Sequence, residues 1–144
     1  MGYSPRAVYW DASAILSALF EDEHSKKAAR MADEKGVHLI STLGYAESCA
    51  VLARIKRERV MSDILVRAAF GALDAGIWRR LNISPAWEDC RDLCSRWSLR
   101  GADLWHLAAA KRIQKEIPEL FLLTFDQRLK HAAEGEGLSQ VSGK

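Results

Sequence analysis

The sequence predicts an α/β protein with three layers, in which a central parallel sheet lies between two layers of helices. Short apolar runs typical of buried strands alternate with longer segments whose apolar residues recur at helical spacing. Strands that alternate with helices favour a parallel sheet covered on both faces. The chain has 144 residues, without an internal repeat or a linker segment, so we expect residues 1–144 to form a single domain.

Two strands and three helices are expected in the first part of the chain. Gly36 is a residue favoured at the end of a helix, and Ser41 and Thr42 favour the start of the next one. The expected elements are a strand at 7–10 (AVYW), helices at 13–20 and 23–36, a strand at 37–40 (VHLI) and a helix at 41–59.

The second part of the chain continues the alternation. Ser62 is a favourable helix start, Pro118 ends a helix, and LFLLTF is the clearest buried strand. In the segment that follows Ser62, the apolar positions 64, 65, 68, 69 and 72 predict either a core face or a dimer surface. The expected elements are a helix at 62–81, a small edge strand at 82–84, helices at 86–99 and 101–117, a strand at 120–125, a helix at 126–137 and a short strand at 139–141.

The composition is that of an ordinary soluble globular protein, with 49% apolar and 28% charged residues. The formal net charge of +2 does not by itself indicate a nucleic-acid-binding protein. Three cysteines are too few for a disulfide framework, so we expect a cytoplasmic location. No apolar run is long enough to cross a membrane, and the N-terminal run lacks a clean cleavage site, so we expect neither a membrane segment nor a signal peptide.

Four acidic residues are candidates for a common site. Asp11 and Asp126 each follow an apolar strand directly, where the carboxyl ends of parallel strands meet. Glu47 has small or apolar neighbours one helical turn away, and Asp103 stands in the first turn of its helix. For Asp11 and Asp126, and for Asp103, a helix-capping role is the alternative. If the four converge, their mutual repulsion favours binding of a divalent cation such as Mg²⁺ or Mn²⁺.

The segments that carry these acids, YWDASAIL, STLGYAES, RGADLWHLAAA and LLTFDQRL, together resemble those of PIN-domain ribonucleases. The closest resemblance is to the toxins of VapBC-type toxin–antitoxin pairs. It implies an α/β/α sandwich, an acidic pocket with one or two Mg²⁺ or Mn²⁺ ions, and endonucleolytic cleavage of RNA. It also implies a cognate antitoxin and a homodimer.

Residue by residue, the resemblance implies that Asp11, Glu47, Asp103 and Asp126 are the catalytic and metal-binding acids. Ser13 and Thr124 match hydroxyl residues that support the site. Trp10 and Trp105 are bulkier than the resemblance leads one to expect beside such a site, and we expect them to narrow the pocket or to stack on a base.

Arg100 is the best candidate for binding an RNA phosphate, because it lies close to Asp103 in the sequence; the alternative is an ordinary solvated side chain. For His106, a packed and hydrogen-bonded side chain is favoured over contact with the substrate.

Three other functions are compatible with an acid after the first strand, but the residues disfavour two of them. A haloacid-dehalogenase-like phosphatase needs a second Asp two positions after the first, where this chain has Ser13. A phosphoacceptor receiver domain needs a Lys after a late strand, where this chain has Asp126. A non-catalytic PIN-like scaffold that binds RNA or an antitoxin remains the alternative to the nuclease.

Overall fold

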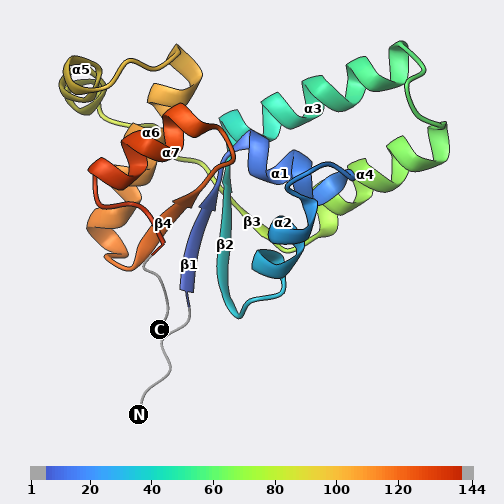
Figure 1. Cartoon of the computed structure of the whole chain (residues 1–144), viewed down its shortest axis with the longest axis horizontal. Coiled ribbons are helices and arrows are strands. Elements are labelled where there is room, and N and C mark those ends of the chain that lie inside the picture. The colour runs from blue at the N-terminus through green and yellow to red at the C-terminus, as the bar shows by residue number, and fades with distance from the viewer. Residues whose placement is uncertain (1–5, 141–144) are drawn as a thin grey trace.

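The protein is described by a computed structural model over residues 6–140, in which a four-stranded sheet separates two layers of helices (Figure 1). The strands are β1 (Arg6–Trp10), β2 (Gly36–Ser41), β3 (Trp78–Leu81) and β4 (Leu120–Leu123). The helices are α1 (Ala12–Leu19), α2 (Ser25–Ala32), α3 (Thr42–Arg57), α4 (Asp63–Ala75), α5 (Trp87–Arg96), α6 (Gly101–Glu116) and α7 (Gln127–Gly135). All strand pairs are parallel, in the order β3-β2-β1-β4. The predicted three-layer α/β/α fold is confirmed.

Each face of the sheet has its own core, because successive side chains of a strand point to opposite faces. Tyr9 of β1 packs with α5, α6 and α7, whereas Val8 and Trp10 pack with α1 to α4. Figure 1 shows the same division, with α5 to α7 on one side of the sheet and α1 to α4 on the other. Residues 7–10 of β1 and all of β4 are therefore apolar and buried, as is typical of parallel strands covered on both faces, whereas β3 at the edge is not.

Gly36 opens β2 and does not end the preceding helix, contrary to the prediction. It lies opposite Arg6 in the β1–β2 register and has a φ of 143°, which side chains disfavour. A Cβ at this position would lie 2.1 Å from the Arg6 carbonyl oxygen. Glycine is thus required here for the close approach of the first two strands.

The helix predicted at 62–81 is confirmed in its first part and wrong in its last part. It ends at Ala75, and Trp78–Leu81 forms β3, which pairs with β2. Gly76 breaks the helix at this point, and the pairing with a distant strand then outweighs local helical spacing. The strand predicted at 82–84 is absent because β3 ends just before it. The final predicted strand is also wrong at residues 139 and 140, while residue 141 lies outside the described residues.

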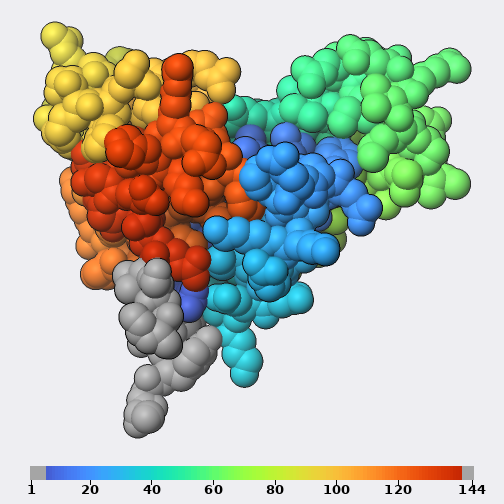
Figure 2. All heavy atoms as spheres, viewed as in Figure 1, coloured from blue at the N-terminus to red at the C-terminus, as the bar shows by residue number. Residues whose placement is uncertain are grey.

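The apolar stripe predicted along α4 is mostly exposed. Val66, Ala69 and Leu73 are the buried residues of this helix, whereas Ile64 is 74% exposed. Figure 2 shows α3 and α4 standing out from the rest of the molecule as a hairpin. The stripe therefore is not a core face, and its use as a dimer surface stays a prediction.

The two outer strands of the sheet differ in what lies at their free edges. The Leu122 N–H of β4 donates to the Leu138 carbonyl, at an N···O distance of 2.8 Å. β3 has only four residues, WRRL, and its two central arginines are exposed. Among the described residues, no helix is long and apolar enough to cross a membrane.

Candidate active site

The four predicted acids all lie at the carboxyl edge of the parallel sheet. Asp11 directly follows β1 and is the N-cap of α1, while Asp126 follows β4 and is the N-cap of α7. Glu47 is in the second turn of α3, which follows β2 without a loop. α6 runs into the start of β4, so its first turn, with Asp103, returns to the same edge. This is the edge at which open α/β sheets bind ligands.

Asp11 is buried and held by three hydrogen bonds. Its Oδ1 accepts from the Ser13 hydroxyl at 2.7 Å and from the Ala14 N–H at 2.9 Å. Its Oδ2 accepts from the Thr124 hydroxyl at 2.5 Å. The side chain is only 3% exposed, so these donors replace water around the carboxylate. The capping and the functional interpretations of Asp11 are therefore compatible.

Ser13 and Thr124 also connect Asp11 to the beginning of α7. The Ser13 oxygen accepts from the Phe125 N–H at 3.0 Å, and the Thr124 oxygen accepts from the Asp126 N–H at 3.1 Å. Asp126 in turn caps α7 by accepting from the Leu129 N–H at 3.0 Å. Residues more than 100 positions apart are thus joined in one polar network at the sheet edge.

Arg100 lies between two of the acids. Its guanidinium nitrogens are 3.8 Å from Asp103 Oδ2 and 3.7 Å from Asp126 Oδ2, so it forms ion pairs but no hydrogen bonds with them. The Arg100 side chain is 82% exposed. A hollow of about 420 Å³ opens here, and it is lined by Leu99, Arg100, Asp103, Asp126, Gln127 and Arg128.

Glu47 is bound by a buried histidine. His106 Nε2 lies 2.7 Å from Glu47 Oε1, and His106 Nδ1 lies 2.6 Å from the Tyr9 hydroxyl oxygen. The expectation that His106 is packed and hydrogen-bonded is confirmed, since the residue is 1% exposed. Tyr9 was missed from sequence, because a tyrosine in an apolar strand gives no indication of its distant polar partner.

The pKa values of Asp11, Asp103 and Tyr9 are all shifted in the direction that opposes negative charge. Burial raises the pKa of Asp11 even though three hydrogen bonds oppose the shift. Burial also raises the pKa of Asp103, and the negative charge of Asp126 adds to this effect. Burial raises the pKa of the Tyr9 hydroxyl further above its usual range. A bound cation would relieve the repulsion between these acids.

The fit of the site to a divalent metal ion is good in chemistry but incomplete in geometry. Carboxylate oxygens are the ligands that Mg²⁺ and Mn²⁺ prefer. Within residues 6–140, however, no three His, Cys, Asp or Glu side chains are arranged so that they could hold an ion together. The four acids lie at the same edge of the sheet, but their side chains would have to rotate before three of them could bind one ion.

Trp10 does not narrow the pocket, contrary to the expectation. It is fully buried on the opposite face of the sheet, where its indole N–H donates to His38 Nδ1 at 3.0 Å. Side chains of a strand alternate between faces, so Trp10 cannot point the same way as its neighbour Tyr9. Trp105 is partly buried and packs edge-on against His106, with ring centroids 5.7 Å apart.

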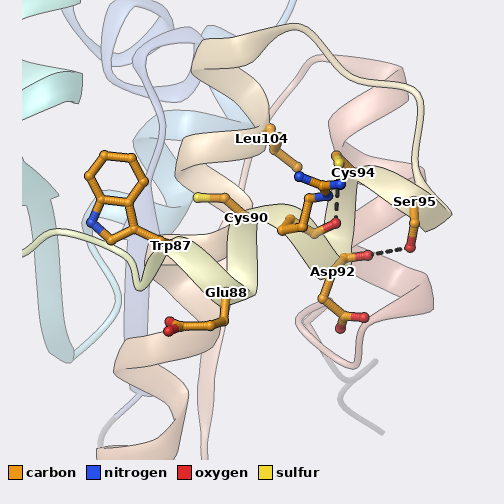
Figure 3. A pocket seen from close by; sticks show the side chains of 8 residues that line it. Trp87, Glu88, Cys90, Asp92, Cys94, Ser95 and Leu104 are labelled. Atoms are coloured by element: carbon orange, nitrogen blue, oxygen red, sulfur yellow. Dashed lines mark hydrogen bonds between the residues drawn. The ribbon is translucent and has the colours of Figure 1, made fainter.

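A larger hollow, of about 840 Å³, lies between α5 and α6 and contains none of the four acids (Figure 3). Trp87 at its rim is 90% exposed. The lining has two carboxylates, Glu88 and Asp92, and one cation, Arg91, so its charge does not favour an RNA phosphate. The smaller hollow contains two of the four predicted acids, Asp103 and Asp126, together with two cations, Arg100 and Arg128, so it is the better candidate for the active site.

Comparisons with known proteins give one matching family and two similar folds. The sequence model of the PIN domain family matches residues 8–135. The toxin VapC20 of Mycobacterium tuberculosis, described as cleaving the sarcin–ricin loop, has 13% identity and a TM-score of 0.61, with 95% of this chain and 100% of that chain covered. PAE2754 from Pyrobaculum aerophilum has 19% identity and a TM-score of 0.59, with 93% and 90% covered. No curated protein sequence matches the chain.

Proposed function

Because this chain belongs to the PIN domain family, we propose that it is an endoribonuclease that depends on Mg²⁺ or Mn²⁺ and acts as the toxin of a VapBC-type toxin–antitoxin pair. The observation that carries the proposal is the convergence of four carboxylates, from four separate helices or helix starts, on one sheet edge. The similarity in fold to VapC20, described as a toxin that cleaves the sarcin–ricin loop, supports the same function.

In this proposal Asp11, Glu47, Asp103 and Asp126 hold the metal ion. When bound, a divalent ion supplies the positive charge that lowers the pKa of water and stabilises negative charge on a phosphate. Ser13 and Thr124 fix Asp11 through the hydrogen bonds at 2.7 and 2.5 Å. We propose that Arg100, which is exposed and pairs with Asp103 and Asp126, binds a phosphate of the RNA backbone.

The partners follow from the same proposal: an RNA substrate, a cognate antitoxin protein and a second copy of the chain. The exposed apolar residues Val60, Ile64 and Leu65 on the α3–α4 hairpin support a protein partner there. Three free cysteines, Cys49, Cys90 and Cys94, support a reducing, cytoplasmic location. We also propose that the whole chain acts as one domain.

The proposal is tested by incubating the purified chain with total RNA. We expect cleavage with Mn²⁺ or Mg²⁺ and its loss with EDTA, resolved by gel electrophoresis. Mapping the cut sites then identifies the RNA. The alternative, a non-catalytic scaffold that binds RNA or the antitoxin, is favoured by the absence of a ready three-ligand group within the described residues. Binding of RNA without cleavage, in the presence of Mg²⁺ and of Mn²⁺, would establish that alternative.

Replacing Arg100 with glutamine is expected to weaken RNA binding about 3- to 10-fold and to reduce the slope of log affinity against log salt by about one. The reason is the loss of one phosphate contact. Fluorescence anisotropy in EDTA, where the RNA stays intact, measures both quantities. The control is Lys35→Gln, which removes an exposed charge just before β2, at the opposite end of the sheet. An unchanged salt slope in Arg100→Gln would exclude the contact.

A further inference from the structure

A row of buried hydrogen bonds connects Glu47 to the interior of the protein. From Glu47 it passes to His106 and then to Tyr9, at 2.7 and 2.6 Å. The Tyr9 hydroxyl oxygen also lies 2.9 Å from Ser41 Oγ, and Ser41 Oγ accepts the Gly44 N–H at 3.1 Å. Tyr9, Ser41 and His106 are all buried, and Glu47 at the outer end of the row is 33% exposed.

The row holds α3 at two points. Ser41 caps the start of α3, and His106 binds Glu47 in its second turn. A methyl group at Gly44 would lie 3.6 Å from Cε1 of His106, so the imidazole packs directly on the turn between these two points. The position of the Glu47 carboxylate is therefore fixed by residues of β1 and α6 as well as by its own helix.

Only one of the two carboxylate oxygens of Glu47 is hydrogen-bonded to His106. Oε1 faces His106, whereas Oε2 makes no hydrogen bond within residues 6–140. His106 lies three residues after Asp103, on the same side of α6. One helix thus supplies an acid of the site and the residue that orients a second acid.

We propose that His106, itself oriented by Tyr9, is a positioning residue that holds Glu47 ready to offer Oε2 to a divalent cation. The proposal rests on the metal-dependent function proposed above. An untethered glutamate would lose side-chain entropy when it binds an ion, and the hydrogen bond to His106 removes part of that loss in advance. Residues that orient metal ligands in this way typically change metal affinity by about 10- to 100-fold when they are replaced.

The test is direct binding of Mn²⁺ to the full chain, measured by titration calorimetry and by the EPR signal of free Mn²⁺. His106→Leu removes the donor and is expected to weaken binding about 10- to 100-fold. His106→Gln, whose amide N–H can reach Glu47, is expected to recover most of the affinity. Tyr9→Phe keeps the ring and loses the hydroxyl, and we expect a smaller loss of about 3- to 10-fold.

The matched control is His38→Leu. His38, in β2, is also a buried histidine; its ring accepts from the Trp10 indole N–H and contacts the Glu34 carbonyl, away from the acids. We expect it to lower thermal stability and to leave Mn²⁺ affinity unchanged. Circular dichroism shows which variants are folded, and Tyr9→Phe serves if His106→Leu does not fold.

Affinity equal to that of the unmodified chain in folded His106→Leu and Tyr9→Phe would overturn the positioning role and leave the proposed function intact. An equal loss in His38→Leu would also overturn it, because the effect would then be general destabilisation. Failure of the unmodified chain to bind Mn²⁺ would overturn both proposals together.

Discussion

Asp11→Asn is expected to lower the rate of Mn²⁺-dependent RNA cleavage by at least about 100-fold. The change removes a negative charge from the edge where the four acids meet, and it keeps the size of the side chain. The amide oxygen of the asparagine can still accept the Ser13 hydroxyl and the Ala14 N–H, so α1 retains its cap. Cleavage of a labelled RNA under single-turnover conditions measures the effect.

The variant is also expected to be at least as stable as the unmodified, metal-free protein at neutral pH. Burial raises the pKa of Asp11 in the folded state above its unfolded value. The stability contributed by the protonated carboxyl is therefore fully present below the unfolded pKa and is lost as the pH rises through the folded pKa. The asparagine side chain does not ionise. The free energy of unfolding, measured in urea at several pH values, should therefore fall less with rising pH in the variant than in the unmodified protein.

Asp33→Asn is the control for both measurements, because Asp33 is exposed at the end of α2, near the opposite end of the sheet. It should retain full cleavage activity. Retention of full activity by Asp11→Asn would contradict the assignment of Asp11 to the metal site, whereas unfolding of the variant would show that its role is chiefly structural.

The largest expected effect on stability comes from Gly36→Ala. A methyl group would lie 2.1 Å from the Arg6 carbonyl oxygen, which belongs to the paired strand β1 and cannot move without breaking the register. The φ of 143° adds strain for any residue with a side chain. We expect a loss of about 2–4 kcal/mol in the free energy of unfolding and a fall of roughly 10 °C in Tm.

Gly71→Ala is the matched control, since it makes the same substitution inside α4. Nothing lies within 4 Å of the added methyl group, and alanine is a better helix former than glycine. This variant should gain about 0.5–1 kcal/mol. Differential scanning calorimetry of the two variants should therefore show shifts of opposite sign, and a neutral Gly36→Ala would show that β1 and β2 can separate at this point.

The alternation of elements and the helix starts were predictable because they depend on local chemistry. Asp11, Ser41, Ser62 and Asp126 all cap helices in the structure, as their residue types indicate. β3 was not predictable, because its apolar and basic residues continue a helical spacing and become a strand only through pairing with β2.

For the site, the sequence identified the residue types but not their contacts. Nothing local links Thr124 to Asp11, 113 positions away, or His106 to Tyr9, 97 positions away. The roles of the four acids as metal ligands remain predictions, because ligand geometry depends on side-chain rotations that spacing along a chain does not specify.

The edges of the sheet have a consequence for self-association. An open outer strand is a template for pairing with a strand of another molecule, and such pairing leads to aggregation. In β4 the Leu122 N–H is already occupied by the Leu138 carbonyl. In β3 the short length and the charges of Arg79 and Arg80 oppose a neighbouring strand. Strand-to-strand pairing between folded molecules is therefore disfavoured at both edges of the sheet.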